Sequence, residues 1–295
     1  MSTVTKVVGF RNLGNTCYMN SALQALLSSN VMNTVILMYI QKNPNCLNRF
    51  SPILIEYCRI IIDLLNSNRP QLTYSPAHFK TILDRGNPWF RGNAQHDSNE
   101  LLVYMINEFA EDKKEKGMAN LVRKVCFGKY KQYVCCSECM NVIEGYFNFL
   151  DVILPIPDAR NPDLAECFQH FGMYDTLEGK NKWDCPTCKK KVVAHKKMEI
   201  HEVPEVAIFT LNRFKGTVKN NTPVRLYQHI ELEEKKLKLI ATVNHYGGTG
   251  GGHYVAHVSR DDKWYVADDS SIRDTTIDTI LNNPSVYMMV YQIDC

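Results

Sequence analysis

The chain has 295 residues, and its 34 basic and 31 acidic side chains leave a formal net charge of +3. Apolar residues make up 45% of it and charged residues 22%, which is typical of an ordinary folded domain and excludes a disordered or fibrous protein. A charge this close to neutral provides no global field that attracts nucleic acid or an anionic membrane, so we expect neither as a partner.

Cysteine usage and hydropathy indicate the compartment. Eleven cysteines is an odd number, and residues 1–6 lack the apolar core of a secretory signal peptide. The most apolar stretches, 31–40 and 53–65, are too short or too interrupted by charges to span a bilayer. We therefore expect a cytoplasmic and/or nuclear protein whose cysteines serve chemistry and metal binding. Without internal repeats or long linkers, we also expect one domain and a monomer.

The first predicted helix begins at Cys17. The apolar residues after it recur at the i, i+3, i+4 spacing that places them on one helix face: Met19, Ala22, Leu23, Leu26 and Leu27. A cysteine in the first turn lies near unpaired backbone N–H groups and the positive end of the helix dipole, which favour thiolate over thiol. The pattern predicts a reactive thiol, and a buried structural cysteine is the alternative.

Later helices have recognisable starts. Ser51-Pro52 and Ser75-Pro76 each place a capping hydroxyl before a proline at the first helical position. A further helix opens near Asp97, which has the spacing of a capping box with Glu100. From Leu121 onward, alternating β-branched and aromatic residues predict strands. We therefore expect a helical first third and a β-rich remainder.

Two Cys-x-x-Cys pairs stand in the middle of the chain, Cys136 with Cys139 and Cys185 with Cys188. Four thiolates in two close pairs provide a closed tetrahedral site for one structural Zn²⁺. The gap between the pairs exceeds the ~15–20 residues of a compact zinc ribbon and suits a clip that joins the tips of two extended strands. A redox pair or free cysteines are the alternatives, and Cys135 is expected to be a spectator.

The last part of the chain predicts a hairpin that carries a histidine. The glycine-rich stretch 247–252 leads into a strand that begins at His253, and a polar turn separates it from a second strand that reaches Asp268. If the turn is centred between Arg260 and Asp261, His253 faces Asp268 across the hairpin. A carboxylate in that position holds an imidazole in one tautomer, as in a Cys-His-Asp triad.

Two alternatives remain within this hairpin. A slip of one residue presents Asp269 to the histidine instead of Asp268. By position alone, His245 and His257 are also candidate bases. The glycines favour His253, because residues without Cβ permit the close approach of another backbone, such as a slender peptide substrate.

Two long motifs thus stand far apart in the chain. The first is residues 9–21, GFRNLGNTCYMNS; the second is residues 252–258, GHYVAHV, followed by Trp264-Tyr265 and Asp268-Asp269. They resemble the Cys box and the His box of the ubiquitin-specific proteases (USPs). The segments that follow the two cysteine pairs also resemble this family, so the resemblance covers nearly the whole chain.

The resemblance implies roles for individual residues. The implied catalytic residues are the nucleophile Cys17, the general base His253, Asp268 to orient it, Asp269 as an alternative or auxiliary to Asp268, and Asn12 for the oxyanion. The implied substrate-binding residues, which grip or enclose the C-terminal tail of ubiquitin, are Gln95, Asp97, Glu100, Gly251, Gly252 and Tyr254. His96 stands where the family usually has a second glutamine. The implied zinc ligands are Cys136, Cys139, Cys185 and Cys188.

The fold implied by the resemblance is an α+β, papain-like cysteine protease fold of the USP type over residues 1–295. Residues 1–118 approximately form a helical thumb. Residues 119–205 are mainly β fingers with the zinc clip, and residues 206–295 are mainly the β-rich palm.

The implied function is thiol-dependent deubiquitination, in which the isopeptide or peptide bond after the C-terminal glycine of ubiquitin is hydrolysed through an acyl-enzyme. The expected partners are ubiquitin and ubiquitinated proteins. A non-catalytic ubiquitin-binding pseudoprotease and a protease for a ubiquitin-like modifier are the alternatives. A zinc-ribbon nucleic-acid binder is disfavoured by the near-neutral charge and the single wide clip.

Overall fold

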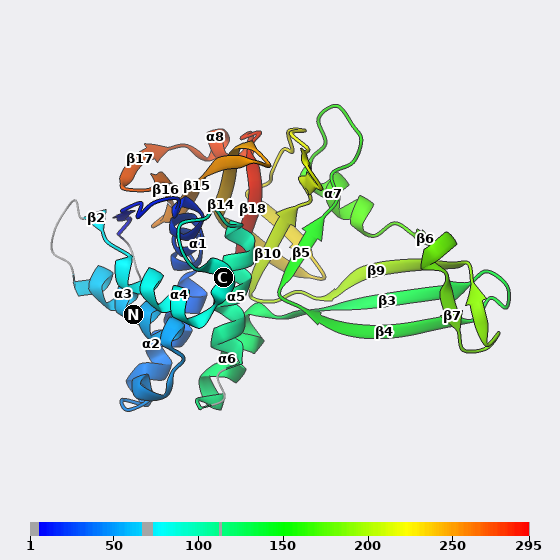
Figure 1. The fold of residues 1–295 in the computed structure, drawn as a ribbon, viewed down its shortest axis with the longest axis horizontal. Helices are drawn as coiled ribbons and strands as arrows, with labels where there is room; N and C mark the ends of the chain where they lie inside the picture. The colour runs from blue at the N-terminus through cyan, green and yellow to red at the C-terminus, as the bar shows by residue number, and fades with distance from the viewer. Residues whose placement is uncertain (1–5, 67–72, 112–113, 295) are drawn as a thin grey trace.

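A computed structural model describes residues 6–66, 73–111 and 114–294. Figure 1 shows a body of helices beside a large sheet, from which a long β-sheet arm projects to one side. The helical first part, the β-rich last part and the β arm between them agree with the architecture expected from the resemblance.

The helices of the first part surround α1. All residues of α1 are buried, because it packs against α5 and against strands β14 and β15 of the large sheet (Figure 1). A short parallel pair, β1 (Gly9–Phe10) with β2 (Thr73–Tyr74), lies next to them. The helices are α1 (Cys17–Leu27), α2 (Asn30–Lys42), α3 (Pro52–Asn66), α4 (Ala77–Gly86), α5 (Ser98–Ala110) and α6 (Lys116–Cys126), with 3₁₀ helices at Leu47–Arg49 and Pro88–Phe90.

Three of these boundaries test the sequence predictions. Helix α3 begins at Pro52, and the Ser51 hydroxyl accepts a hydrogen bond from the backbone N–H of Leu54, as predicted. Helix α4 begins one residue later than predicted, because Pro76 is its N-cap. The strands predicted from Leu121 onward are wrong at their start, because α6 extends to Cys126.

The misplaced boundary at α6 has a clear cause. Its buried residues follow the helical spacing i, i+1, i+4, i+7 and i+8: Met118, Ala119, Val122, Val125 and Cys126. This pattern outweighs the β propensity of the two valines, because tertiary packing of an apolar stripe stabilises a helix more than propensity does.

The large sheet has eight strands in the order β17-β16-β15-β14-β18-β10-β5, with β13 also pairing with β14. Its neighbours pair antiparallel except β10 and β5, which are parallel. The bounds are β5 (Asp151–Leu154), β10 (Val206–Leu211), β13 (His229–Leu232), β14 (Lys235–Gly248), β15 (Gly251–Arg260), β16 (Lys263–Asp268), β17 (Ser271–Thr275) and β18 (Val286–Ile293). The hairpin β11 (Phe214–Lys215) and β12 (Val218–Lys219) lies outside this sheet.

Alternating side chains divide the core into two layers. On β10, Val206 and Ile208 pack with the helices of the first part, whereas Ala207 and Phe209 belong to a second cluster. That second cluster also contains residues of α7 (Leu164–Phe171) and α8 (Ile277–Leu281). The sheet is therefore covered on both faces, and α1 packs on the face to which Tyr254, Ala256 and Val258 of β15 belong.

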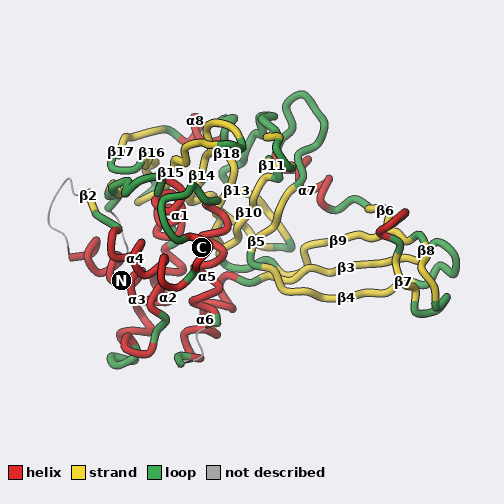
Figure 2. The backbone as a smooth tube through the Cα atoms, in the orientation of Figure 1, coloured by secondary structure: helices red, strands yellow, loops and turns green. Residues whose placement is uncertain are grey.

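The arm is a four-stranded sheet in the order β4-β3-β9-β6 (Figure 2). A separate hairpin, β7 with β8, lies at its far end. Cys136 and Cys139 flank the turn after β3, and Cys185 and Cys188 flank the turn after β7. The bounds are β3 (Gly128–Cys136), β4 (Val142–Phe149), β6 (Asp175–Leu177), β7 (Trp183–Cys185), β8 (Lys190–Val192) and β9 (Ala194–Glu202), with a 3₁₀ helix at Gly179–Asn181.

The approximate subdomain limits do not coincide with element boundaries everywhere. The limit predicted at residue 118 falls inside α6, and β5 belongs to the large sheet although its residues lie in the range expected to be mainly fingers. Among the described residues, no single helix is long and apolar enough to cross a membrane. The bent pair α1 and α2, at 76° to each other, passes that test only when taken together.

Candidate active site

A tight turn delivers Cys17 to the start of α1. Gly14 and Asn15 have φ of 104° and 54°, in the left-handed region that glycine and asparagine tolerate best. The Thr16 hydroxyl accepts a hydrogen bond from the backbone N–H of Leu13 at 2.8 Å, which closes the turn. Cys17 is consequently the first residue of the helix, as predicted.

The electrostatics of Cys17 differ from the prediction. Cys17 is only 4% exposed, and this burial raises the pKa of its thiol. Backbone N–H groups of Tyr254 and Tyr18 lower that pKa, but the Asp269 carboxylate raises it further. The backbone N–H groups thus act in the predicted direction, but desolvation outweighs them and favours the thiol in the free protein.

His253 and Asp268 form a direct pair. His253 Nε2 lies 2.7 Å from Asp268 Oδ1, and the second Asp268 oxygen accepts a weaker bond from Arg273 at 3.5 Å. Since Nε2 is engaged with the carboxylate, Nδ1 is the imidazole nitrogen left for proton transfer. Tyr254, the next residue along β15, is the one whose backbone N–H reaches Cys17. The two motifs therefore meet at the contact between α1 and β15.

The register of this hairpin differs from the predicted one by two residues. Arg260 lies opposite Lys263, and the turn is Asp261-Asp262, with φ of 49° and 60°. Two central residues with positive φ form the turn whose twist matches the flanking strands. Because side chains alternate with a period of two, a shift of two keeps His253 and Asp268 on one face. His253 and Asp268 therefore contact each other diagonally across the two strands and are not directly opposite.

Asp269 joins the two motifs in a different way. Its carboxylate accepts hydrogen bonds from Asn12 Nδ2 at 2.8 Å and from Asn20 Nδ2 at 2.7 Å. Its backbone oxygen accepts from the N–H of Phe10 at 2.7 Å. One nitrogen of His253 and one oxygen each of Asp268 and Asp269 lie within 4.8 Å of one another. Both carboxylates therefore remain candidates to support the histidine, and Asp268 makes the shorter contact.

Asn20 was missed by the sequence reasoning. It lies one turn after Cys17 on α1, so a helical i, i+3 relation to the nucleophile was the signal that could have identified it. Asn12, by contrast, was predicted. Its Oδ1 accepts from the backbone N–H groups of Gly14 and Thr16, and its Nδ2 donates to Asp269. A carboxamide has two N–H bonds, so the second can donate to an oxyanion.

His245 and His257, the alternative bases, are buried in the sheet. Burial lowers the pKa of each to about 4, so both are neutral near pH 7. His253 is instead half-buried and has a carboxylate partner. A base must exchange its proton with a reacting group, and these surroundings favour His253.

The glycine-rich hairpin tip is held by Gln95. Its side-chain Nε2 donates to the backbone oxygen of Gly252 at 3.0 Å, and its Oε1 accepts from the N–H of Gly252 at 3.1 Å. A Cβ on Gly252 would lie 2.2 Å from His245 Nε2, so this glycine is required by the protein's own packing. A Cβ on Gly251 would meet Gln95 Oε1 only at 3.6 Å, an ordinary contact. Gln95 therefore positions the segment that leads into His253.

Asp97 caps α5, as one reading of the sequence predicted. One carboxylate oxygen accepts from the backbone N–H groups of Asn99 and Glu100 at 2.7 and 3.1 Å. The other accepts from the hydroxyls of Tyr287 and Tyr254 at 2.7 and 3.3 Å. Asp97 thus accepts four hydrogen bonds, which is about the number that a carboxylate can accept.

Glu100 does not complete the capping box. Its side chain accepts a hydrogen bond from the indole N–H of Trp89 at 3.1 Å instead of from the N–H of Asp97. His96, the departure from the family pattern, packs its ring against Tyr18 and Phe90 with centroids 5.2 and 5.3 Å away, and its burial lowers its pKa. His96 is therefore part of an aromatic cluster, whereas Glu100 lies at the surface.

A hollow of about 320 Å³ opens beside the start of α5. Its lining carries the acidic residues Asp97, Glu100 and Asp151 and the buried cation Arg213. Burial raises the pKa of Asp151, and Asn99 donates to its carboxylate at 3.2 Å. The charged groups that line the hollow are thus mainly acidic, and the hollow adjoins the residues predicted to hold a substrate tail.

The four predicted zinc ligands come together at the tip of the arm. Cys136 Sγ lies 3.9 Å from Cys188 Sγ, and Cys139 Sγ lies 3.7 Å from Cys185 Sγ. All four sulfurs lie within 4.8 Å of one another. Backbone N–H groups of Glu138 and Cys139 point at Cys136 Sγ, which favours its thiolate. This cluster could hold a metal ion. Cys135 is not part of it, as predicted.

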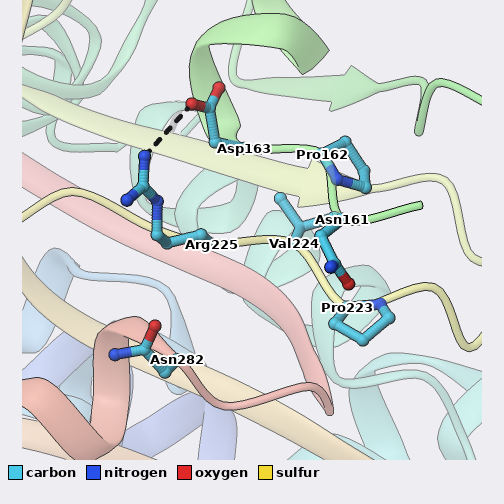
Figure 3. Close-up of a pocket in the computed structure, with 7 residues that line it drawn as sticks. All are labelled: Asn161, Pro162, Asp163, Pro223, Val224, Arg225 and Asn282. Carbon is cyan, nitrogen blue, oxygen red and sulfur yellow. Dashed lines mark ion pairs between the residues drawn. The ribbon is translucent and has the colours of Figure 1, made fainter. Parts of the chain in front are cut away.

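A second hollow, of about 330 Å³, lies between the start of α7 and the segment 223–225. Figure 3 shows Asp163 and Arg225 pointing toward each other across it, with Asn282 at its edge. Their ion pair spans 3.5 Å, and the Asp163 carboxylate also caps α7 and accepts from the Tyr227 hydroxyl. Asp163 and Arg225 therefore already have partners within the protein. None of the predicted site residues lines this hollow.

Comparisons with known proteins agree with this geometry. Residues 8–291 match the model of the family described as ubiquitin carboxyl-terminal hydrolase. The chain is 24% identical over 335 residues to ubiquitin carboxyl-terminal hydrolase 2 of Homo sapiens, covering 97% of this chain and 55% of that protein. It is 25% identical over 361 residues to ubiquitin carboxyl-terminal hydrolase 4 of Vanderwaltozyma polyspora, covering 96% of this chain and 41% of that protein. The chain thus spans about half the length of these curated relatives.

A solved structure has the same fold. In a SAGA DUB module that contains Ubp8 with Sgf11, Sus1 and Sgf73 and is bound to monoubiquitin, one chain superposes with a TM-score of 0.82. The sequence identity is 22%, and the match covers 100% of this chain and 71% of that one. This likeness confirms the expected fold class. The match of the family model over nearly all described residues establishes that the chain belongs to the ubiquitin carboxyl-terminal hydrolase family.

Proposed function

We propose that this chain is a thiol-dependent deubiquitinase that hydrolyses the bond after the C-terminal glycine of ubiquitin. The observation that carries the proposal is the meeting of α1 and β15. There a cysteine at a helix start lies against the strand whose first residues include a histidine paired at 2.7 Å with Asp268. A nucleophile, a base and a group that orients the base are the parts that acyl transfer by a thiol needs.

The proposed reaction has two half-reactions. His253 accepts the proton of the Cys17 thiol, and the sulfur attacks the carbonyl carbon of the terminal glycine. The tetrahedral intermediate collapses when His253 gives that proton to the leaving amine, which leaves a thioester on Cys17. His253 then takes a proton from water, and the resulting hydroxide attacks the thioester carbonyl. The tetrahedral intermediate collapses to release the carboxylic acid, and His253 returns its proton to the Cys17 sulfur.

Several groups would assist this chemistry. The free N–H of Asn12 and nearby backbone N–H groups would stabilise the oxyanion, and one such donor is typically worth about 3 kcal/mol. Burial raises the pKa of Cys17 in the free protein, so the thiol needs the base to lose its proton. Asp268 would support the positive charge that His253 gains.

Ubiquitin is the proposed substrate, and ubiquitinated proteins are its proposed source. Support comes from the family model and from the relative whose structure was solved with monoubiquitin. Glu100 and the acidic hollow suit a basic tail. Gly251, Gly252 and Tyr254 are proposed to wall the channel for the glycine tail, and the Tyr254 hydroxyl donates to Asp97. We further propose a monomer in the cytoplasm and/or nucleus, without nucleic-acid or membrane partners.

Direct hydrolysis tests this proposal. The chain would be incubated with ubiquitin that carries a fluorogenic amine on its C-terminal carboxyl group, and in parallel with the same conjugate of a ubiquitin-like modifier. We expect fluorophore release from ubiquitin. Binding of ubiquitin without release would support the pseudoprotease alternative, whereas release from the modifier alone would move the activity to that substrate.

We also propose one structural Zn²⁺ at the tip of the arm, held by Cys136, Cys139, Cys185 and Cys188. A Zn–S distance of ≈2.3 Å places tetrahedral sulfurs about 3.8 Å apart. The separations of Cys139 from Cys185 and of Cys136 from Cys188 are 3.7 and 3.9 Å. Four thiolates leave no open position, so the metal would stabilise the arm and take no part in catalysis.

Removing the zinc site should destabilise the arm while sparing the chemistry. A cross-link across the long segment between the two cysteine pairs contributes about 4 kcal/mol in the chain-entropy model, so a Cys136→Ala, Cys185→Ala variant should melt roughly 8 °C lower. Zinc content falls from one ion per chain to none, and KM rises more than kcat falls.

The matched control for this variant is Cys135→Ala, which removes a neighbouring thiol outside the cluster. It should keep its metal, its melting temperature and its KM. A double variant that matches the wild type in melting temperature and kinetics would refute a structural metal at this place.

A further inference from the structure

The strand that carries His253 follows a segment with little stiffness of its own. Residues 247–252 are five glycines and Thr249. Gly247 has φ of 102°, in the left-handed region that glycine tolerates best. Glycine has more backbone freedom than any other residue, so holding this segment in one conformation costs more entropy than it would elsewhere. Contacts from outside the hairpin are therefore needed to fix the backbone that leads into His253.

Two side chains from other parts of the chain hold this segment at its two ends. Gln95 binds the backbone N–H and oxygen of Gly252, at the end of the glycines. The Lys219 ammonium donates to the backbone oxygens of His245 and Gly247 at 2.7 and 3.0 Å, where the chain enters the glycines. Lys219 is thus the counterpart of Gln95 at the other end of the segment.

Lys219 binds the strand that lies beside His253. The residues at its contacts pair across the antiparallel ladder of β14 and β15 with the residues around the histidine: His245 with Tyr254, Tyr246 with His253, and Gly247 with Gly252. Paired strands are joined by backbone hydrogen bonds, so a shift of residues 245–247 is transmitted to residues 252–254. The Lys219 contacts therefore act on the position of His253 through the backbone of the neighbouring strand.

The Lys219 ammonium comes from a hairpin that is anchored in the core. Lys219 lies on β12, which pairs with β11. Arg213 stands directly before β11 and is 1% exposed, and its guanidinium donates to the backbone oxygens of Asn220 and Thr222 at 3.0 and 2.9 Å. This arginine joins the two ends of the hairpin. The support from which Lys219 reaches the glycine-rich segment is therefore fixed.

The contact is made by a partly buried charge. Burial and the nearby Arg213 both lower the pKa of Lys219, because each disfavours the charged ammonium. The two carbonyl oxygens offset this cost, since hydrogen bonds from a charged donor are stronger than those between neutral groups. A second tie joins the same two hairpins, because the Thr249 hydroxyl donates to the backbone oxygen of Thr217 at 2.9 Å.

We propose that Lys219 is a positioning residue for the catalytic base. Its ammonium fixes the glycine-rich segment and thereby holds the His253 imidazole where it accepts the Cys17 proton. This inference rests on the proposed function and adds to it a residue outside the triad. An ammonium has three N–H donors and binds two backbone oxygens at once, which explains a lysine at this place.

Steady-state hydrolysis of the fluorogenic ubiquitin substrate by the full chain is the first test. Lys219→Met removes the ammonium and keeps the apolar stem. We expect its kcat to fall by roughly 10- to 100-fold, because a displacement of about 1 Å at a catalytic group costs about 10²-fold. KM should stay within about threefold of wild type. Lys219→Arg, which keeps the charge and several donors, should restore kcat to within about threefold of wild type.

Alkylation of Cys17 by a small neutral electrophile is the second test, and it shows whether Lys219 acts through His253. The rate is followed at Cys17 by peptide mass. We expect Lys219→Met to slow alkylation at least about fivefold in the wild-type background and by less than about twofold in the His253→Ala background. A merely structural role does not give this pattern, since loosening the fold exposes the buried thiol and accelerates the reaction in both backgrounds.

Lys215→Met is the matched control. It removes an exposed lysine from the same hairpin and should leave kcat, KM and the alkylation rate unchanged. Lys219→Gln, which has a neutral amide in place of the ammonium, is measured in parallel. It should also lower kcat, and it decides the question if Lys219→Met does not fold.

The outcomes separate this inference from the proposed function. If the wild type hydrolyses ubiquitin and the folded Lys219 variants have the same kcat, the inference is overturned and the deubiquitinase proposal stands. An equal slowing of alkylation in both backgrounds also overturns it, because the effect would not pass through His253. If the wild type does not hydrolyse ubiquitin, the proposed function falls, and the alkylation rates alone decide the role of Lys219.

Discussion

Replacing Cys17 by alanine is expected to abolish the covalent adduct that the wild type forms with ubiquitin carrying a C-terminal thiol-reactive group. Turnover of the fluorogenic substrate should fall by about 10⁴-fold or more, because loss of the nucleophile removes the acyl-enzyme route altogether. The measurement is intact-protein mass: the wild type gains the mass of one ubiquitin, and the variant does not.

The control for Cys17 is Cys46→Ala. Cys46 is also buried in the helical part of the chain, and burial raises its pKa as it does that of Cys17. This variant loses a core thiol in the same way but should keep the adduct and the turnover. If the adduct persists in Cys17→Ala and disappears in Cys46→Ala, then Cys46 and not Cys17 is the nucleophile.

The raised pKa of Cys17 adds a pH dependence to this result. Burial disfavours the thiolate, so below the raised pKa the thiol stays protonated in the free protein. Alkylation of Cys17 by a small neutral electrophile should therefore accelerate as pH rises toward and past the ordinary range of a cysteine, and should be slow at pH 7. A rate that is already maximal at pH 7 would contradict this direction.

The second large effect is expected at Asp268. Replacement by alanine removes the carboxylate that lies 2.7 Å from His253 Nε2, and kcat should fall by about 10³–10⁴-fold. Asp268→Asn should lose less, because an amide oxygen can still accept the imidazole N–H. The variants should bind ubiquitin as well as the wild type, since neither changes the hollow beside α5.

Asp269→Ala is the matched comparison. Its carboxylate holds Asn12 and Asn20, so its loss should loosen the segment before Cys17 and reduce kcat less than Asp268→Ala does, with a measurable decrease in melting temperature. Kinetics and thermal unfolding of both variants decide the question. If Asp269→Ala costs more in kcat at unchanged stability, Asp269 and not Asp268 is the third member of the triad.

Local chemistry made several features predictable. Cys17 begins a helix because an apolar stripe with helical spacing follows it directly, and Pro52 begins another because its missing N–H is not needed there. The four knuckle cysteines were identifiable because two close pairs suit one metal ion. Asp97 caps α5 because a short acidic side chain reaches the free N–H groups of a first turn.

Other features depended on surroundings that spacing does not encode. Strands were expected from Leu121, but α6 continues because its apolar stripe packs against α5 and α2. The hairpin turn lies at Asp261-Asp262, where two residues adopt positive φ, and only the paired strands reveal that register. The residue Asn20 gained its role from Asp269, which is far away in the chain.

The sequence by itself determined the residues available for chemistry, the helical nature of the first part and the pairing of cysteines into one cluster. These follow from side-chain type and short spacing, which act over one helix turn or one strand pair. The tertiary structure alone decided that burial raises the pKa of Cys17, that Gln95 holds Gly252 and that Asp97 is occupied by two tyrosines while Glu100 faces outward. Desolvation and hydrogen bonding between distant segments depend on which surfaces meet when the chain folds, and no local pattern contains that information.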